Sequence, residues 1–341
     1  MRRALALAKR GGGRVSPNPM VGCVLVKDGR IVGEAYHREF GGPHAEVLAL
    51  SAAGEDARGS AAYVTLEPCC AHSGKKTPPC APALAAAGVA RVVAADLDPN
   101  PAVSGKGLRL LREAGVKTAV GLCAEDAARL NRGFWTRQRL KRPYVILKTA
   151  LSLDGQAYAR GGRSRWITAE PARRLAHKLR ARADAVLVGS GTVLADDPAL
   201  TAHGAGPNPV RVVLDTKLRI SRRARLLDGQ APTWIFTASP KKVVGAEIVR
   251  VRSVRGRLDL RAVLRELARR GIGVLLVEGG PAVHAAFLKA RAVDEAQVFL
   301  SPKLVSGDSN PNLAPRLASP RLKKVGQDFL FYGKVQCLRA S

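Results

Sequence analysis

One imidazole, one carboxylate and two thiols stand in an order that could hold a catalytic metal ion. Glu46 follows His44 by two residues, and Cys69 and Cys80 each come directly after a proline. Three nitrogen and sulfur ligands that leave one position open to water are typical of catalytic zinc. Zinc lowers the pKa of that water, and a carboxylate that does not bind the metal can carry protons. The pattern is typical of zinc-dependent deaminases, in which Glu46 would be the proton shuttle.

The metal ligands are chosen from several candidates. A single histidine or cysteine is more often a core residue than a ligand, so no one of these residues carries the prediction. His44, Cys69 and Cys80 in this order favour a zinc site over a structural role. Cys70 is adjacent to Cys69, which holds the usual ligand position after proline, so Cys69 is the predicted ligand and Cys70 stays as the alternative.

The local sequence places these side chains at the starts of helices. Pro43 precedes a helix-forming run over residues 45–50, which Gly54 can end. The imidazole and the carboxylate then lie in the first turn, where the helix dipole favours an ionised carboxylate. The apolar run 61–66 predicts a strand that leads to the first cysteine, and two prolines begin a second helix over residues 80–87.

The first part of the chain alternates between apolar strands and amphipathic helices, which predicts an α/β layered sheet. Asp28-Gly29 between two apolar runs is a hairpin signal. Lys141-Arg142-Pro143 predicts a domain boundary, because proline cannot continue a helix, so we expect domains 1–141 and 142–341. The other expected elements are an amphipathic helix in residues 1–10, strands 21–26, 31–36, 90–95 and 116–120, and helices 107–114 and 125–140.

The second part alternates in the same way and is predicted to be another α/β domain. Residues 204–209 and 306–320 are rich in glycine, proline, serine or asparagine and are predicted to be loops. The expected strands are 144–148, 185–189, 210–214, 233–237, 273–277 and 296–300, with a final pair 329–332 and 334–338; the expected helices are 170–182, 259–270 and 281–289.

Composition limits the class of protein and its compartment. The net charge of +29 suggests nucleic-acid binding, but only 4% of residues are aromatic and no basic run carries interleaved aromatics. A solvated basic surface, which would also attract phosphorylated small molecules, is the simpler interpretation. Six unevenly placed cysteines favour metal binding in a reducing compartment, so we expect a cytoplasmic enzyme. The short, charge-interrupted apolar start and the absence of a long apolar run predict neither a signal peptide nor a membrane span.

Two stretches of the second part could bind a cofactor. A buried strand over residues 274–277 leads to Gly279-Gly280 and a proline, and backbone N–H groups at such a turn can bind phosphate. The same turn could be a simple tight connection, and it lacks the glycine pattern of a standard dinucleotide fold. The stretch 189–198 offers small residues, Thr192, Asp196 and Asp197, or it is an ordinary loop.

Taken together, these motifs resemble the bacterial family of bifunctional deaminase/reductases of riboflavin biosynthesis. The resemblance runs through nearly the full chain and in the family order. Its motifs lie at 16–26, 41–46, 63–69, 77–80, 98–101, 105–107, 147–155, 166–168, 192–201 and 277–281.

The resemblance implies two consecutive reactions on a phosphorylated pyrimidine. The first is hydrolytic deamination of 2,5-diamino-6-ribosylamino-4(3H)-pyrimidinone 5′-phosphate, and the second is NADPH-dependent reduction of its ribosyl group to a ribityl chain. It also implies a cytidine deaminase-like domain with Zn²⁺, then a dihydrofolate reductase-like domain with NADPH. The family's reductase domain commonly dimerises, so we expect a homo-oligomer, and no nucleic-acid or membrane partner.

The resemblance also assigns site residues. His44, Cys69 and Cys80 match the zinc ligands, Glu46 matches the proton shuttle, and Asn18 is a pyrimidine contact. The matching NADPH-binding residues are Ala150, Trp166, Thr192, Asp196, Thr216, Gly280, Pro281, Ala282, Val283, His284, Ala285 and Ala286. The matching substrate-binding residues are Ser164, Arg180, Leu200, His203 and Glu278, where Arg180 would clamp a phosphate or hydroxyl, and Lys148 could support the reacting end.

Two features depart from the family pattern. The stretch from Cys69 to Cys80 is longer by roughly two residues, which a loop can absorb. His203 stands where the family often has a phosphate-binding arginine, so either a neighbour such as Arg211 compensates or phosphate is bound more weakly. The alternatives are a deaminase with a non-catalytic second domain, and a nucleic-acid deaminase, whose two cysteines would be closer together.

Overall fold

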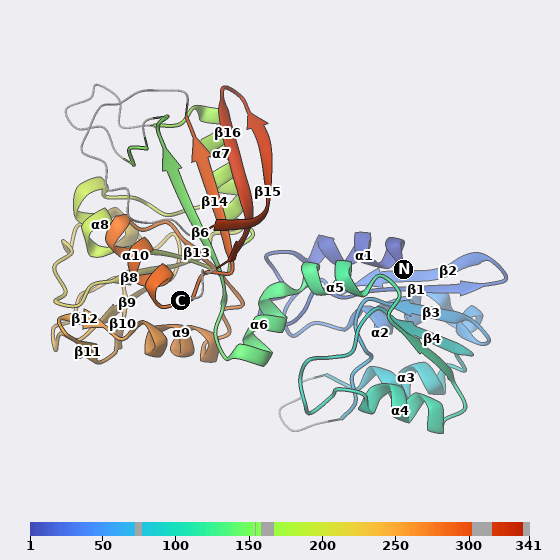
Figure 1. The fold of residues 1–341 in the computed structure, drawn as a ribbon. Helices are drawn as coiled ribbons and strands as arrows, with labels where there is room; N and C mark the ends of the chain where they lie inside the picture. Colours follow the sequence, from blue (N-terminus) through green and yellow to red (C-terminus); the bar gives the residue numbers. More distant parts are fainter. Residues whose placement is uncertain (72–76, 154, 158–166, 302–315, 337–341) are drawn as a thin grey trace, which may run out of the picture. The chain divides into compact units, whose positions relative to one another are not determined.

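Alternating strands and helices build two main sheets, one in each half of the chain (Figure 1). The computed structural model describes residues 1–71, 77–153, 155–157, 167–301 and 316–336. Contacts divide the chain into unit 1, Met1–Lys141, and unit 2, Arg142–Ser341, and each unit is described by itself.

Unit 1 contains a five-stranded sheet in the order β2-β1-β3-β4-β5. An antiparallel hairpin of β1 and β2 turns at Asp28 and Gly29, whose φ angles of 49° and 75° suit a tight two-residue turn. Strands β3, β4 and β5 run parallel to one another. The strands are β1 (Gly22–Lys27), β2 (Arg30–Tyr36), β3 (Ala61–Val64), β4 (Arg91–Ala94) and β5 (Lys117–Val120).

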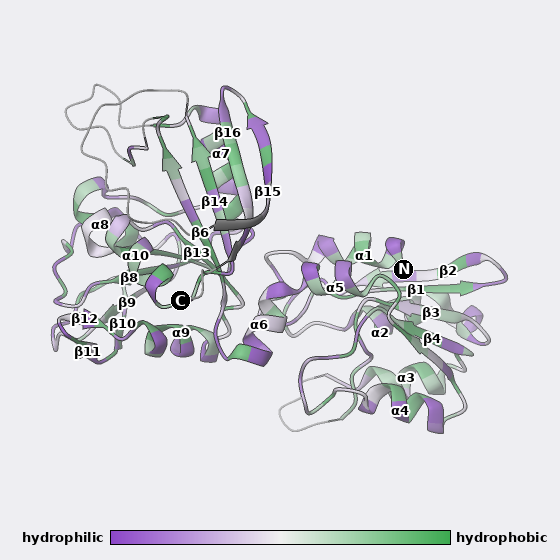
Figure 2. Ribbon diagram, viewed as in Figure 1, coloured by the Kyte–Doolittle hydropathy of each residue, from purple (hydrophilic) through white to green (hydrophobic). Residues whose placement is uncertain are grey.

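Helices cover both faces of this sheet. Cys23 and Leu25 of β1 belong to a core shared with α2, α3 and α4, whereas Val24 between them packs against α1 on the other face. This alternation follows from the two-residue period of a strand. Figure 2 shows largely hydrophobic β1 and β3 and hydrophilic residues along α4. The helices are α1 (Arg2–Ala8), α2 (Ala45–Ala53), α3 (Cys80–Ala86), α4 (Lys106–Glu113), α5 (Ala124–Leu130) and α6 (Arg132–Leu140), with short 3-10 turns at Lys9–Gly11 and Gly54–Ala57.

The prediction of one helix over 125–140 was wrong, because the chain breaks into α5 and α6 at Asn131. The side chain of Asn131 accepts a hydrogen bond from the backbone N of Met20 at 2.8 Å and donates one to its carbonyl at 2.9 Å. These two hydrogen bonds hold the chain between α5 and α6 against the segment that precedes β1. That segment carries Asn18.

Unit 2 contains a nine-stranded sheet in the order β10-β9-β8-β7-β13-β6-β14-β16-β15. The seven strands from β10 to β14 in this order are parallel, and β16 and β15 are antiparallel to their neighbours. The strands are β6 (Tyr144–Leu151), β7 (Ala185–Gly189), β8 (Val210–Leu214), β9 (Thr233–Thr237), β10 (Glu247–Arg250), β13 (Val274–Val277), β14 (Glu295–Leu300), β15 (Arg316–Val325) and β16 (Asp328–Gln336), beside a small pair β11 (Ser253–Val254) and β12 (Arg257–Leu258).

Helices again pack on the two faces of the sheet. The apolar residues of α9 and α10 join a core with one face of β6, β7 and β13, while α8 packs on the opposite face. Central strands buried on both faces explain the continuous apolar runs in the sequence. The helices are α7 (Glu170–Arg180), α8 (Ser190–Asp196), α9 (Leu260–Arg269) and α10 (Pro281–Lys289), with a 3-10 turn at Arg225–Leu227.

Several boundaries in unit 2 differ from the predictions. The stretch after β7 forms helix α8 instead of an ordinary loop, and strand β10 was not predicted. One strand, β16, replaces the predicted pair 329–332 and 334–338, because Gly333 stays in the sheet opposite Ala296 of β14. Part of the predicted loop 306–320 belongs to β15, and the rest lies outside the described residues.

Candidate active sites

Unit 1 brings the three predicted metal ligands together. The candidate ligand atoms of His44, Cys69 and Cys80 all lie within 4.8 Å of one another. The Nδ1 atom of His44 is 3.5 Å from the sulfur of Cys69 and 3.3 Å from that of Cys80. Tetrahedral zinc with ordinary Zn–N and Zn–S bonds separates its ligand atoms by roughly 3.3–3.8 Å. One nitrogen and two sulfur donors at these separations fit a zinc ion.

Local structure explains how the ligands meet. His44 is the N-cap of α2, and Cys80 is the first residue of α3 after Pro79. Cys69 follows β3 and accepts a hydrogen bond from the backbone N of Cys80 at 3.4 Å. His44 and Cys80 therefore lie at helix starts, as the sequence predicted, whereas Cys69 lies in the connection between β3 and α3 and not near a helix start.

Two contacts show which cysteine and which imidazole nitrogen face the cluster. Cys70 is buried, and its thiol donates to the carbonyl of Ala102 at 3.8 Å, so it faces away from the cluster. The Nε2 atom of His44 lies 3.1 Å from the hydroxyl of Thr77, which leaves Nδ1 toward the two thiols. The alternative ligand Cys70 is thus not part of the cluster. Lys75 and Lys76, in the lengthened stretch between the two cysteines, lie outside the described part of the chain.

Glu46 lies beside the cluster as a buried carboxyl group. Only 3% of its surface is exposed, and its Oε2 atom has no hydrogen-bond partner among the described residues. Burial, together with the nearby Cys69, raises the pKa of Glu46 to about 7. A carboxyl group with such a pKa can both accept and release a proton near neutral pH.

Asn18 reaches the same region through a histidine that the sequence reasoning missed. The Nδ1 atom of His37 contacts the carbonyl of Pro43 at 3.0 Å, and its Nε2 atom contacts the amide nitrogen of Asn18 at 3.2 Å. The rings of His37 and His44 are 5.4 Å apart in an edge-to-face arrangement. His37 follows β2 directly, and this position was the signal available in the sequence.

A second residue that the sequence reasoning missed, Glu67, holds the loop before α4 next to this site. Its buried carboxylate accepts hydrogen bonds from the backbone N–H groups of Asp98, Gly105, Gly107 and Leu108 at 2.9–3.3 Å. The loop before α4 is therefore held against the segment that carries Cys69. A Cβ atom at residue 107 would lie 1.9 Å from the carbonyl of Pro68, so only glycine fits there.

Unit 2 contains a cavity of about 920 Å³ that collects most of the predicted reductase residues. A site of this size and mixed polarity is typical of cofactor binding. Trp166 and Ser164 lie outside the described residues, and Ala285 is not part of the lining. The predicted residues that line it are Ala150, Arg180, Thr192, Asp196, Leu200, His203, Thr216, Glu278, Gly280, Pro281, Ala282, Val283, His284 and Ala286.

A buried charge cluster lies in this cavity. Glu278 accepts hydrogen bonds from Nε and Nη2 of Arg180 at 2.8 and 2.9 Å, and Lys148 Nζ lies 4.0 Å away. Burial alone would raise the pKa of Glu278, but the charges of Arg180 and Lys148 lower it to about 2. Nη1 of Arg180 donates to the carbonyl of Thr201 at 3.0 Å. Arg180 is thus engaged by the protein, which suits holding Glu278 better than clamping a phosphate.

A stacked pair of imidazoles lies beside this cluster. The rings of His177 and His203 are 4.2 Å apart and nearly parallel, and both residues line the cavity. Burial and the charge of Arg180 lower the pKa of both imidazoles. His177, on α7, was missed in the sequence, although its position three residues before Arg180 places both on one helix face.

Glycine residues shape the turn before α10, which lines the cavity. A Cβ atom at residue 279 would lie 2.6 Å from Cβ of Val283, so glycine permits α10 to begin close to the end of β13. A Cβ atom at Gly191, at the start of α8, would have no atom within 4 Å. The space beside this glycine is therefore open, and Gly191 lines the cavity. The buried Nε2 atom of His284 has no partner among the described residues. Small residues, an unpaired polar atom and a cavity of this volume fit NADPH.

Arg211 does not compensate for His203 in the way the sequence suggested. Its side chain is fully buried, and its guanidinium binds Asp228 and two backbone carbonyls. It therefore has no access to a phosphate in the cavity.

None of the helices in the described ranges has the length and apolarity needed to span a membrane.

Comparisons with known proteins match both units. The cytidine and deoxycytidylate deaminase zinc-binding region matches residues 1–96, and the RibD C-terminal domain matches residues 143–329. The riboflavin biosynthesis protein RibD of Escherichia coli is 43% identical, with 96% of each chain covered. RibD of Aquifex aeolicus is 42% identical and covers 98% of this chain and 97% of its own.

Solved structures show the same fold over the whole chain. Acinetobacter baumannii RibD has a TM-score of 0.89 at 35% identity, covering 98% of this chain and 97% of that one. A diaminohydroxyphosphoribosylaminopyrimidine deaminase/5-amino-6-(5-phosphoribosylamino)uracil reductase from Thermotoga maritima has a TM-score of 0.88 at 38% identity, with the same coverage. The predicted fold class, a cytidine deaminase-like domain followed by a dihydrofolate reductase-like domain, is confirmed.

Proposed function

The chain belongs to the RibD family of bifunctional riboflavin-biosynthesis enzymes, and we propose that it catalyses both family reactions. Unit 1 deaminates 2,5-diamino-6-ribosylamino-4(3H)-pyrimidinone 5′-phosphate, and unit 2 reduces the ribosyl group of the product to a ribityl chain. The observation that carries the proposal is the cluster of His44, Cys69 and Cys80 beside the buried Glu46.

In unit 1 the protein supplies ligands and a proton carrier. Zinc held by His44, Cys69 and Cys80 would activate water for attack on the amino-bearing ring carbon. Glu46 takes one proton from the attacking water and passes it to the ring nitrogen. It then takes the second proton from the new hydroxyl group and passes it to the amino group, which leaves as ammonia. The raised pKa of Glu46 suits both directions of transfer. Asn18, held by His37, is positioned to bind the pyrimidine.

In unit 2 the protein orients two bound partners. The Gly279-Gly280 turn and the start of α10 would hold the phosphates of NADPH, which would supply the hydride when bound. The Arg180–Glu278 pair and the ammonium of Lys148 lie in the cavity and would bind hydroxyls at the reacting end of the ribosyl chain. Leu200 and His203, which also line the cavity, would complete the substrate site.

Product mass tests the proposal directly. Zinc-loaded protein is incubated with the diaminopyrimidinone ribosyl phosphate, with and without NADPH, and the products are weighed by mass spectrometry. We expect deamination without NADPH and a further gain of two hydrogens with it. Deamination alone would remove the reductase assignment, and no reaction in either case would remove both.

A Glu46→Gln variant sharpens the assignment of the proton carrier. It keeps the size of the side chain, so zinc stays bound, while deamination should fall by roughly 10²- to 10⁴-fold. Metal analysis of the variant separates this result from loss of the ion. Retained deamination would contradict the role of Glu46.

We also propose that the chain acts as a homo-oligomer. Strand β15 is an outer strand of the unit 2 sheet, and Leu322 on it is 58% exposed. The resemblance supports this proposal, because the family's reductase domain commonly dimerises. Leu322 offers an apolar contact, whereas Pro320, Lys323 and Lys324 on the same strand oppose direct pairing of strand edges. The mass in solution, measured by light scattering, tests this.

A further inference from the structure

Three residues that are not glycine adopt left-handed backbone along one wall of the unit 2 cavity. The φ angle is 40° at Asp197, 54° at Leu200 and 48° at His203. Such angles are unfavourable for side chains with a Cβ atom, so they persist only where other contacts hold them. Leu200 and His203 line the cavity. Residues 197–203, here the wall segment, therefore owe their shape to contacts behind the cavity.

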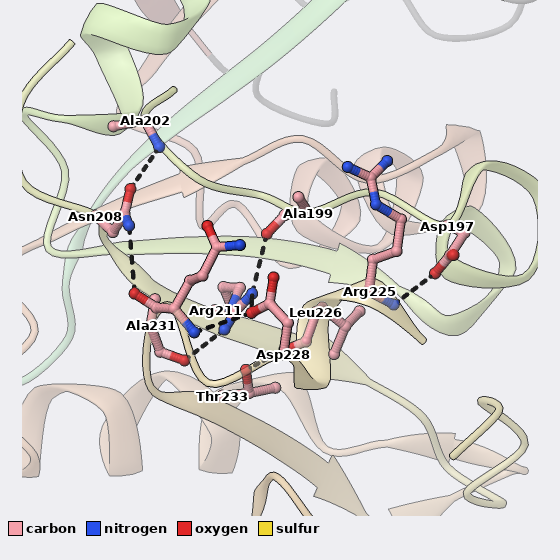
Figure 3. A network of polar contacts seen from close by, with 11 residues as sticks. Asp197, Ala199, Ala202, Asn208, Arg211, Arg225, Leu226, Asp228, Ala231 and Thr233 are labelled. Atoms are coloured by element: carbon pink, nitrogen blue, oxygen red, sulfur yellow. Dashed lines mark hydrogen bonds and ion pairs between the residues drawn. The ribbon is translucent and has the colours of Figure 1, made fainter. Parts of the chain in front are cut away.

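Arg211 of β8 provides the central contact. Its side chain has no exposed surface, and its Nη1 atom donates to the carbonyl of Ala199 at 3.2 Å (Figure 3). Its Nη2 atom donates to the carbonyl of Ala231 at 2.6 Å, and its charge is paired with Asp228 at 2.9 Å. One guanidinium thus joins the wall segment to residues 228–231.

Two further contacts fix the ends of the wall segment in the same network. The backbone N of Ala202 donates to Oδ1 of Asn208 at 2.9 Å, and the amide of Asn208 donates to the carbonyl of Gln230 at 3.3 Å. At the other end, the backbone N of Arg225 donates to Oδ1 of Asp197 at 2.9 Å (Figure 3). Arg211 lies between these two anchors.

A buried cation is an unfavourable choice for stability alone. An apolar side chain of similar size often serves a protein core equally well, and the neighbours Val212 and Val213 on β8 are fully buried apolar residues. A guanidinium offers what they do not, which is several donors in a fixed plane. A buried arginine at this position is explained if the reaction requires the Ala199 carbonyl, and with it the wall segment, to be held in one place.

We propose that Arg211 is a positioning residue for the reductase reaction. It does not touch the substrate, and it sets substrate affinity by holding Leu200 and His203 in place from behind the cavity. This inference rests on the proposed reductase function of unit 2.

An Arg211→Met variant tests it. The side chain is of similar length and apolar, and Asp228, which is 28% exposed, can be solvated after the change. We expect the KM for the deaminated pyrimidine to rise about tenfold or more, the scale of losing one hydrogen bond to a charged group. The kcat, the KM for NADPH and the deaminase rate should change little.

Two more variants separate positioning from simple destabilisation. Arg270 is another ion-paired arginine of unit 2, partly buried, and it binds Glu247 and Glu266. Arg270→Met should therefore lower the Tm without raising that KM. Asn208→Ala removes the surface anchor of Ala202 and should raise the KM even if Arg211→Met fails to fold.

The outcomes distinguish this inference from the function on which it rests. A wild-type protein that does not reduce the pyrimidine would overturn both. Wild-type reduction with an unchanged KM in Arg211→Met, or in Asn208→Ala where the first variant does not fold, would overturn the positioning role alone.

Discussion

His177 is a residue whose surroundings keep its imidazole neutral. Burial lowers its pKa to about 4, His203, Arg180 and Lys148 act in the same direction, and Glu278 opposes them. In the unfolded chain histidine titrates near about 6.5, so between these two values the unfolded state binds more protons. The stability of unit 2 should therefore fall as the pH is lowered through this window. Thermal unfolding measured at several pH values checks this.

A pair of neighbouring variants isolates the contribution of His177. His177→Gln removes the titrating group and should make the decline in Tm with falling pH less steep. Lys178→Gln changes the adjacent exposed residue and should leave the slope as in the wild type. Equal slopes for all three proteins would show that His177 is not the group responsible.

At the scale of residues, the sequence predicted the metal ligands better than it predicted the tertiary contacts of individual side chains. The order of His44, Cys69 and Cys80 was enough to predict a cluster, because each ligand position is marked by an adjacent proline or helix start. Cys70 was excluded only by its contact with Ala102, which lies far along the chain. Arg211 was one of two alternatives for the missing phosphate contact, and its burial rules that alternative out; nothing in an apolar strand pattern tells whether a basic side chain faces a cavity or a core.

At the scale of elements, the break between α5 and α6 depends on one side chain. Asn131 is 3% exposed and makes two hydrogen bonds to the backbone of Met20. Asn131→Ala would remove the partners of the partly buried N–H and carbonyl of Met20, at a cost of about 1–3 kcal/mol in the free energy of unfolding. Denaturant unfolding of the variant measures this cost.

A control in the same helix shows whether the effect is specific. Gln138→Ala in α6 changes a half-buried amide and should shift the free energy of unfolding by less than about 0.5 kcal/mol. If Asn131→Ala is as mild as this control, the helix break does not depend on the Met20 contacts.

Helices and strands could be predicted from the sequence wherever the tertiary contacts favour the same structure as the local sequence pattern. Most strands of the two sheets and the helices α2, α3, α9 and α10 lie where apolar period, proline and glycine placed them, whereas β10 and β15 were not predicted. Asn131 was missed because its partner is distant in sequence, so 125–140 looked like one helix. Gly333 was taken as a turn because a glycine inside a strand is unfavourable, yet its backbone pairs with Ala296 in the sheet.

For the whole molecule, motif order was more informative than charge. A net charge of +29 suits nucleic acid, a phosphorylated pyrimidine or plain solubility, so it separates none of these. The two units each have a sheet and a core of their own. Each candidate site also takes its described side chains from one unit, since the metal cluster lies within residues 44–80 and the cavity within residues 148–299.

This separation predicts that variants inactive in different units complement each other. Glu46→Gln should lose deamination and still reduce the deaminated pyrimidine, whereas Arg180→Ala should deaminate and reduce poorly, because Glu278 loses its bidentate partner. When the two variants are mixed with the diaminopyrimidine and NADPH, the doubly converted product should appear after a lag that shortens with protein concentration, since the intermediate must leave one molecule and bind another. Each variant alone is the control. Two active single-step variants that yield no final product when mixed would show that the intermediate is not released.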